Sequence, residues 1–207
     1  MRKDFQLIKA DFISIVPILK EIANKIQENL NEIFNEVEHI DRIGCRVKTE
    51  QSFLDKTLKS KNGKVKYENP IQEIQDLIGA RIVVYYKSDV DYIVTEIKKY
   101  YQTVEQNKIV PDDVMKFGYE GLHLICFIPN AIYSSHKMNK LIPDFFELQI
   151  KTLYQHAWSQ AEHGLGYKTE TSLSYEEERK LAFISAQSWG ADTMLQELFN
   201  TQKENRR

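Results

Sequence analysis

The stretch from Asp144 to Lys168 carries the polar side chains with the clearest capacity for chemistry. Its first part alternates apolar and polar positions, as a β-strand with one buried face does. The polar face presents an acid, an amide and an ammonium in succession, at Glu147, Gln149 and Lys151. Such a face is typical of the floor of a polar cleft, but an ordinary strand with a solvated side has the same pattern. Residues upstream favour the cleft.

Basic side chains gather on two consecutive predicted elements. Arg46 and Lys48 share one face of a strand predicted over 43–49. The helix predicted over 50–59 presents Ser52, Lys56 and Lys59 on one face, and its N-terminal amides also favour an anion. Because little acid lies close by in the sequence to neutralise these cations, the cluster suits a triphosphate, although a solvated charged helix has the same pattern. There is no GxxxxGK[ST] sequence, so this site is not a P-loop.

Two carboxylates are candidates for a metal site beside these cations. Asp76 falls near the C-terminal end of a short helix predicted over 70–79, where the helix dipole disfavours a negative charge and favours a cationic partner. Glu147 supplies the second carboxylate. Mg²⁺ usually takes one or two carboxylates together with phosphate oxygens and water. Sequence spacing alone leaves open whether the two acids meet in space.

A glycine-flanked segment, GYEGLH over 118–123, adds an aromatic ring and a histidine. Tyr119 between glycines is suited to stacking on a base, and equally to anchoring the loop. His123 at the start of a predicted strand is suited to binding a phosphate, and equally to a structural hydrogen bond.

The elements that must position these side chains alternate between helices and strands, which places the chain in the α+β class. We expect one mixed, mainly antiparallel sheet of about five strands flanked by helices. We also expect a single domain over 1–207, made of N-terminal helices over 1–40, a catalytic core over 41–170 and a C-terminal helix over 171–207.

Composition narrows the classes of function. The chain has 207 residues, 28% of them charged, and a net charge of −2, which excludes an overall basic field for binding DNA. Any polyanion site must therefore be local. Cys45 and Cys126 show no ligand spacing and indicate a reducing compartment. No secretory segment and no run of eighteen apolar residues occurs, so we expect a cytoplasmic protein without a membrane partner.

Five short motifs, taken in order, resemble those of the RelA/SpoT-type alarmone synthetase domain, which has a nucleotidyltransferase-like fold. The resemblance covers about residues 40–170, and the hydrolase and regulatory domains of the long family members have no counterpart in it, as in a small standalone synthetase. The motifs are RVKT over 46–49, DLIGAR over 76–81, GY with LH over 118–123, ELQIKT over 147–152, and Trp158 with EH and YK over 158–168.

The resemblance implies an ATP-dependent pyrophosphokinase, in which an acceptor 3′-hydroxyl attacks the β-phosphorus of ATP and expels AMP. Glu147, Asp76 and Arg81 would be catalytic. Asp76 and Glu147 would bind Mg²⁺, Glu147 would also activate the acceptor hydroxyl, and Arg81 would contact the adenine. The ATP phosphates would be held by Arg46, Lys48, Ser52, Lys56 and Lys59. The acceptor would be bound by Tyr119, which stacks on its base, and by His123, Gln149 and the position of His156.

Two positions depart from the pattern of the alarmone-making members, both on the acceptor side. Glu120 stands where a basic residue is typical, and His156 stands where asparagine is typical. An acid there would repel the phosphates of GDP or GTP. The variant motifs are more similar to toxic members of the family, so the 3′-terminal adenosine of tRNA is the favoured acceptor.

Synthesis of (p)ppGpp from GDP or GTP, synthesis of (p)ppApp, and a non-catalytic nucleotide-binding regulator remain as alternatives. The resemblance also leaves an antitoxin protein and a homo-oligomer open as partners.

Overall fold

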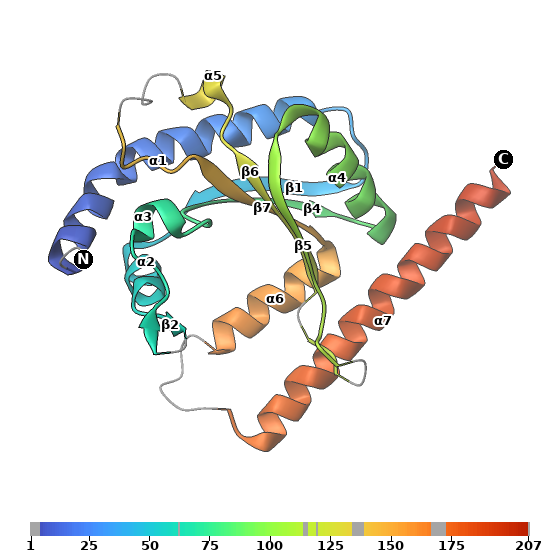
Figure 1. Ribbon diagram of the computed structural model, residues 1–207. Helices are drawn as coiled ribbons and strands as arrows, with labels where there is room; N and C mark the ends of the chain where they lie inside the picture. Colours follow the sequence, from blue (N-terminus) through green and yellow to red (C-terminus); the bar gives the residue numbers. More distant parts are fainter. Residues whose placement is uncertain are drawn as a thin grey trace.

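The computed structural model describes residues 5–61, 63–113, 116–118, 120–133, 139–166 and 173–206. A five-stranded sheet in the order β1-β4-β7-β6-β5 forms its centre (Figure 1). β4 and β7 run parallel, whereas the other neighbouring pairs run antiparallel. This confirms the predicted α+β class with a mixed, mainly antiparallel sheet. The strands are β1 (Ile40–Val47), β4 (Ile78–Val84), β5 (Thr103–Ile109), β6 (Gly121–Phe127) and β7 (Phe145–Thr152).

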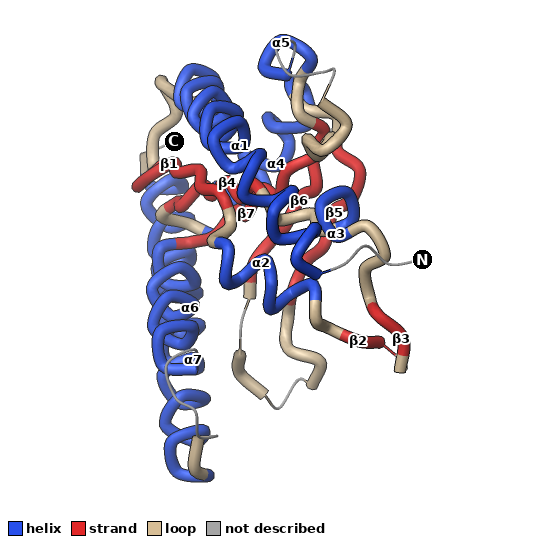
Figure 2. The backbone as a smooth tube through the Cα atoms, turned by 90° about the vertical axis from the view of Figure 1, so that its left-hand side faces the viewer, coloured by secondary structure: helices blue, strands red, loops and turns tan. Residues whose placement is uncertain are grey.

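Helices lie on both sides of this sheet, with α1 and α4 on one side and α6 on the other, and α7 runs beside α6 (Figures 1 and 2). No helix in the described ranges has the length and apolarity needed to span a bilayer. The helices are α1 (Phe5–Ile33), α2 (Glu50–Thr57), α3 (Pro70–Glu73), α4 (Lys87–Tyr100), α5 (Asn130–Tyr133), α6 (Leu153–Gly166) and α7 (Tyr175–Asn205). A small hairpin pairs β2 (Ser60–Lys61) with β3 (Lys64–Val65).

The hydrophobic core lies between the sheet and helices α1 and α4. α1 is one helix of 29 residues with Pro17 inside it, and its apolar stripe recurs at the helical period. Phe12 of α1 stacks on Phe53 of α2 with ring centroids 4.1 Å apart, so α2 is fixed against α1. The strands contribute alternate residues, all of them buried, among them Ile78, Ala80, Ile82 and Val84 of β4 and Phe146, Leu148 and Ile150 of β7.

The opposite face of the sheet carries polar side chains, as predicted for β7. Strand register aligns these residues across the sheet, because residues directly opposite one another point to the same side. Arg46 of β1 pairs with Gly79 of β4, which pairs with Glu147 of β7. The next row contains Gly44, Arg81, Gln149 and His123. Gly79 lacks a side chain, so the floor is open between the arginine and the acid.

The helix predicted over 70–79 begins at Pro70 as expected, but its predicted extent is wrong. α3 ends at Glu73, Ile74 is extended, and β4 begins at Ile78. Pairing with β1 fixes this path, because Ile78 pairs with Val47 and the Lys48 amide donates to the Leu77 carbonyl at 2.9 Å. A segment this short gains little from helix formation alone, so strand pairing and burial prevail. Asp76 therefore lies in a turn, and the helix-dipole argument for its charge does not apply.

α7 joins the rest of the molecule through aromatic contacts, such as the stacking of Phe199 on Tyr86, and through polar contacts. Its N-terminus is capped by Ser174, whose hydroxyl accepts from the Glu177 amide. The buried residues of α7 are Ser185 and Asp192. The Thr152 hydroxyl at the end of β7 donates to Asp192 Oδ2 at 2.9 Å, and the Ser185 hydroxyl donates to the Gly118 carbonyl at 3.1 Å. α7 thus holds in place both the C-terminal end of β7 and the loop before β6.

Candidate active site

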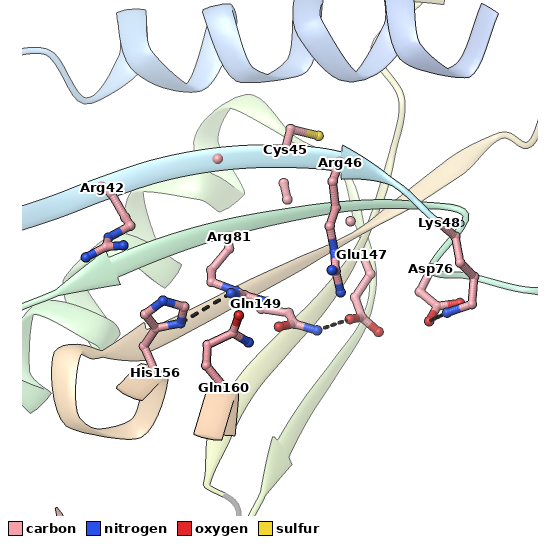
Figure 3. A pocket seen from close by; sticks show the side chains of 13 residues that line it. Arg42, Cys45, Arg46, Lys48, Asp76, Arg81, Glu147, Gln149, His156 and Gln160 are labelled. Atoms are coloured by element: carbon pink, nitrogen blue, oxygen red, sulfur yellow. Dashed lines mark hydrogen bonds and ion pairs between the residues drawn. The ribbon is translucent and has the colours of Figure 1, made fainter. Parts of the chain in front are cut away.

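A cavity of about 380 Å³ opens on the polar face of the sheet, between β1, β4, β7 and α6 (Figure 3). Of the predicted site residues, Arg46, Lys48, Asp76, Arg81, Glu147, Gln149 and His156 line it. Sequence positions more than a hundred residues apart therefore meet in one place. The other lining residues are Arg42, Gly44, Cys45, Gly79, Ala80 and Gln160.

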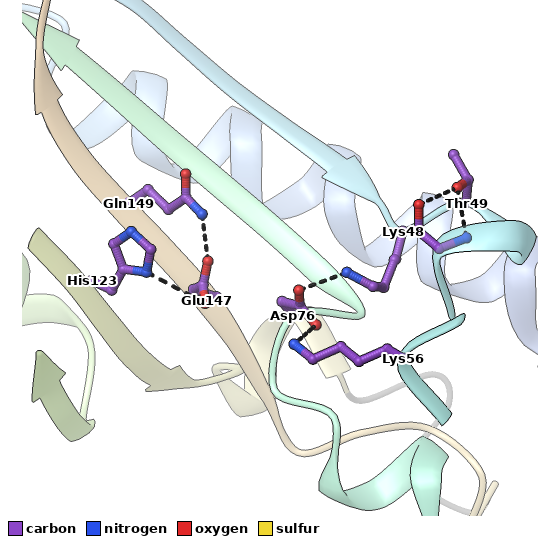
Figure 4. A network of polar contacts seen from close by, with 8 residues as sticks. Lys48, Thr49, Lys56, Asp76, His123, Glu147 and Gln149 are labelled. Atoms are coloured by element: carbon purple, nitrogen blue, oxygen red, sulfur yellow. Dashed lines mark hydrogen bonds and ion pairs between the residues drawn. The ribbon is translucent and has the colours of Figure 1, made fainter. Parts of the chain in front are cut away.

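Asp76 is held by two ammonium groups (Figure 4). Lys48 Nζ donates to Asp76 Oδ2 at 2.6 Å, and Lys56 Nζ donates to Oδ1 at 2.9 Å. Burial opposes ionisation of this carboxyl, but the hydrogen bonds and charges of the two lysines outweigh it, so the pKa of Asp76 lies below its ordinary value. The sequence places little acid close to these lysines along the chain, and the acid that neutralises them comes from a different element.

Glu147 is held by partners of a different kind. Gln149 Nε2 donates to its Oε1, and His123 Nδ1 lies 3.6 Å from its Oε2. Burial raises the pKa of Glu147, whereas the contacts with His123 and Gln149 lower it by more, so the net shift is downward. The charge of Asp76 acts in the opposite direction, which is expected for two acids that face one cavity.

The two acids fit a magnesium ion that arrives with a polyphosphate. Both carboxyls have lowered pKa values and are therefore ionised at neutral pH, and both line the cavity. Hard oxygen donors of this type suit Mg²⁺, which completes its coordination with phosphate oxygens and water. Each oxygen of Asp76 accepts a hydrogen bond from a lysine, so two ammonium groups lie beside this candidate metal ligand.

His156 contacts Arg81. Arg81 Nη1 lies 3.2 Å from His156 Nδ1 (Figure 3). Burial and the positive charges of Arg81, Arg42 and Lys151 lower the pKa of His156. The imidazole is therefore neutral at pH 7, so Nδ1 accepts the hydrogen bond from Arg81 and Nε2 carries the proton. The sequence assigned His156 to the acceptor side, whereas the structure brings it to the arginine assigned to adenine.

Four predicted residues lie away from the cavity lining. Lys56 reaches Asp76, and His123 reaches Glu147, so each supports a lining acid. Ser52 accepts a hydrogen bond from the Thr49 hydroxyl at 2.9 Å within the first turn of α2. Lys59 follows α2 and is exposed. Tyr119 and the Tyr167–Lys168 pair lie outside the described residues.

Sequence reasoning missed two polar lining residues, Arg42 and Gln160. Arg42 stands two positions before Gly44 and four before Arg46 on the same strand, but the predicted strand began at Ile43 and excluded it. Gln160 follows His156 by one helical turn on α6. Continuing the alternation of the strand back to Arg42, and the helical repeat from His156 forward to Gln160, would have predicted both residues.

Comparison with known proteins now identifies the family. Residues 45–172 match the family described as "Region found in RelA / SpoT proteins", which covers more than half of the 207-residue chain. The chain belongs to this family. This RelA/SpoT protein is 27% identical over 156 residues to the GTP pyrophosphokinase YwaC of Bacillus subtilis (strain 168), a match covering 70% of this chain and 65% of YwaC. It is also 27% identical over 165 residues to the GTP pyrophosphokinase YjbM of that strain, covering 77% and 72%.

Solved structures show the same fold for this RelA/SpoT protein. The crystal structure of small alarmone synthetase 1 from B. subtilis superposes with a TM-score of 0.75 at 23% identity, covering 92% of this chain and 96% of that one. That synthetase has also been solved bound to its product pppGpp and bound to AMPCPP. The fold is therefore that of the small alarmone synthetases.

Proposed function

We propose that this RelA/SpoT protein is a pyrophosphokinase that transfers the β,γ-diphosphate of ATP to the 3′-hydroxyl of GDP or GTP. The observation that carries the proposal is the meeting of two ionised carboxylates, Asp76 and Glu147, with four cationic side chains in one cavity. A nucleoside triphosphate with its metal matches that arrangement of charge. The cationic side chains that line the cavity are Arg42, Arg46, Lys48 and Arg81.

The donor nucleotide lies along β1 and β4 in this proposal. Arg46 and Lys48 bind the triphosphate, and Lys56 reaches the same phosphates from α2. Arg81 contacts the adenine and is held in place by His156, whose Nδ1 accepts from its guanidinium. Ser52 and Lys59, which the structure places outside the lining, contribute at the edge of the cation cluster through the first turn and the end of α2. Support comes from the shared cavity and from the hydrogen bonds of Asp76.

The reaction is an in-line displacement at the β-phosphorus of ATP. The acceptor 3′-oxygen forms a bond to the β-phosphorus, the bond from that phosphorus to the α,β-bridging oxygen breaks, and AMP leaves. Glu147 accepts the proton of the 3′-hydroxyl, and its hydrogen bond from Gln149 keeps the carboxylate oriented. The cations neutralise charge that shifts to the leaving oxygen, so most of the rate comes from alignment and electrostatics.

Asp76 and Glu147 would hold Mg²⁺ together with phosphate oxygens. When bound, this ion supplies charge neutralisation for the β- and γ-phosphates and fixes their geometry.

Guanosine nucleotides are the first choice of acceptor for two reasons. The relatives YwaC and YjbM are GTP pyrophosphokinases, and small alarmone synthetase 1 has been solved with its product pppGpp. The sequence argument against them also weakens, because Glu120 borders a separate cavity of about 20 Å³ with Trp158 and Asp192, and does not line the main cavity. Tyr119, His123 and Gln149 form the acceptor side of this proposal. The proposed activity would take place in the cytoplasm, where both nucleotides occur.

A second candidate acceptor is the 3′-terminal adenosine of tRNA. Burial raises the pKa of Asp192, and the charge of Glu120 adds to that rise, so these two acids act on one another. Negative potential around these acids disfavours a free di- or triphosphate more than a chain end with a single phosphodiester. A neutralising antitoxin would be the expected partner in this case only. A homo-oligomer is compatible with both candidates.

An acceptor panel tests the proposal. The protein is incubated with Mg²⁺ and γ-³²P-ATP plus GDP, GTP, ATP or deacylated tRNA, and products are separated by thin-layer chromatography and gel electrophoresis. We expect label in guanosine tetra- or pentaphosphate, with one AMP released per labelled product. Label in tRNA alone would support the second candidate, and label in an adenosine product would indicate (p)ppApp synthesis. If ATP binds but no acceptor yields AMP, the protein is a non-catalytic nucleotide-binding regulator.

A further inference from the structure

The side of α7 that its own chain buries most deeply is polar, whereas the opposite side exposes large apolar residues. The buried residues are Ser185 and Asp192, which bond to the loop before β6 and to the end of β7. On the opposite side Phe183, Met194 and Leu198 recur at the helical period and are 64%, 58% and 63% exposed. α7 lies at the edge of the molecule, so this side faces away from the other elements (Figure 1). An exposed apolar face of this kind marks a site of association. The residues of this face, which we call the α7 stripe, are Phe183, Gln187, Gly190, Met194 and Leu198.

The α7 stripe has a glycine at its centre that the packing of the chain itself does not require. Gly190 lies midway between Phe183 and Leu198. A Cβ built on Gly190 would meet no atom of the described residues within 4 Å, apart from the neighbouring backbone of α7. Glycine in the interior of a helix is destabilising relative to alanine, and its advantage is that another backbone is able to approach closely. The position therefore points to a second helix that crosses α7 at Gly190.

The α7 stripe is complementary to itself when two copies of the helix run antiparallel. With a two-fold axis beside Gly190, Phe183 of one copy lies opposite Leu198 of the other. Gln187 of one copy then lies opposite Met194 of the other. A two-fold interface uses the same patch on both subunits, so one stripe supplies both halves of the contact. The large side chains pack at both ends of the stripe, and the small glycines lie where the helices are closest.

Charge favours the antiparallel direction. Arg179 and Glu204 are both exposed, and the helical period places them along the same edge of the α7 stripe, near opposite ends of the helix. Antiparallel pairing brings Arg179 of each copy within about one helical turn of Glu204 of the other, whereas parallel pairing brings like charges together. The dipoles of the two helices also oppose one another when the helices are antiparallel.

We propose that a second copy of this chain docks on the α7 stripe, with the two α7 helices antiparallel and crossing at Gly190. A second copy fits because both the apolar register and the charges are self-complementary. The inference goes beyond the proposed activity and does not depend on it, because no residue of the stripe lines the active-site cavity. Ser185 and Asp192 lie on the other side of α7, so their bonds to the rest of the chain remain in the dimer.

Sedimentation equilibrium of the full chain over a series of concentrations measures the association. We expect the unaltered protein to form dimers at micromolar concentration. Met194→Glu places an acid in the apolar contact of each copy, so it should raise the dissociation constant about a hundredfold. Ile13→Glu is the matched control, because Ile13 is an exposed aliphatic residue of the other long helix, α1, and it should leave the dissociation constant unchanged. Circular dichroism and thermal unfolding verify the fold of each variant.

A charge exchange tests the direction of the helices. Arg179→Glu and Glu204→Arg each replace attraction by repulsion at two symmetric places in the antiparallel pair, so each should raise the dissociation constant about tenfold. The double variant restores opposite charges and should return the dissociation constant to that of the unaltered protein. In a parallel pair the double variant would have no such advantage over the single variants.

Cysteine cross-linking tests the register. The double variant Phe183→Cys with Leu198→Cys should form a covalent dimer with a short bis-maleimide, because the two positions face each other. Each single variant should not, because two copies of one position lie about 22 Å apart along an antiparallel pair. The unaltered protein, which keeps Cys45 and Cys126, gives the background.

Four results would overturn the inference. The first is a chain that stays monomeric throughout the concentration series, including one whose α7 stripe binds an unrelated protein. The second is an equal effect of Met194→Glu and Ile13→Glu on the dissociation constant. The third is cross-linking of either single cysteine variant, which would show a parallel pair. The fourth is a charge exchange that fails to restore the dimer.

Discussion

Asp76 and Glu147 are two acids at one cavity that are held in opposite ways. Asp76 lies in a turn and accepts hydrogen bonds from Lys48, which follows β1, and from Lys56 of α2. Glu147 lies in the middle of the sheet and accepts from a neutral amide, with a histidine 3.6 Å away. Lysines on flexible stems are able to move to an arriving phosphate, whereas an amide on the same strand can only orient its acid. We therefore propose that the corner formed by Lys48, Lys56 and Asp76 captures the phosphates, and that Glu147 with Gln149 and His123 aligns the acceptor.

Replacement of Glu147 is expected to give the largest effect. Glu147→Gln removes the base and one magnesium ligand, so we expect AMP release with acceptor present to fall by about 10²–10⁴-fold. AMPCPP should still bind, because the lysines of the Asp76 corner remain. Glu197→Gln on the exposed side of α7 is the matched control. Retention of most of the activity by Glu147→Gln would contradict a catalytic role for this carboxylate.

Removal of a lysine at the Asp76 corner should weaken donor binding. Lys48→Met or Lys56→Met deletes a charge-assisted hydrogen bond worth roughly 1.5–3 kcal/mol, which corresponds to a KM for ATP raised about ten- to a hundredfold. The KM for the acceptor should change much less. Lys20→Met on the exposed side of α1 serves as the control. If both KM values rise together, the corner does not act on the donor alone.

Replacement of His123 tests, through the pH dependence of the activity, whether this histidine acts on Glu147. The pKa of Glu147 is lowered in part by its contact with His123, so the ionised carboxylate persists below its ordinary range. In His123→Gln this pKa rises, and the decline of kcat/KM on the acid side should therefore begin at a higher pH. A pH profile of both proteins measures the shift. An unchanged acid limb would show that His123 does not act on Glu147.

Replacement of His156 should have the smallest effect. His156→Asn is expected to weaken, without abolishing, the hydrogen bond that the Arg81 guanidinium donates, at a cost of about 1 kcal/mol, which is about a fivefold rise in the KM for ATP. Steady-state kinetics with each substrate varied in turn would measure it. A change confined to the KM for the acceptor would return His156 to the acceptor side, where the sequence assigned it.

The local sequence pattern predicted β7 well, because burial of one face of a strand makes apolar and polar residues alternate along it. Phe146, Leu148 and Ile150 are buried, while Glu147 and Gln149 face the cavity, as the alternation indicated. The C-terminal helix predicted over 171–207 is observed as α7, and its start follows a serine with a glutamate three residues on, a pattern that favours a helix N-terminus.

Contacts between distant elements could not be read from the sequence. The turn at Asp76 depends on the pairing of Ile78 with Val47 across thirty-one positions of chain, which no local propensity records. The salt bridges from Lys48 and Lys56 to Asp76 and the contact of His156 with Arg81 have the same origin. The motifs named these residues, but only the sheet order shows which of them meet.

A double-mutant cycle on nucleotide binding tests the central claim most directly, namely that Asp76 and Glu147 serve one metal-bound ATP. The affinity for AMPCPP with Mg²⁺ is measured for the unaltered protein, Asp76→Asn, Glu147→Gln and the double variant. Groups that share one metal ion couple strongly. The double variant should therefore lose little more affinity than whichever single variant binds AMPCPP more weakly. Losses that simply add would show that the two acids act on separate ligands, and would contradict this account of the site.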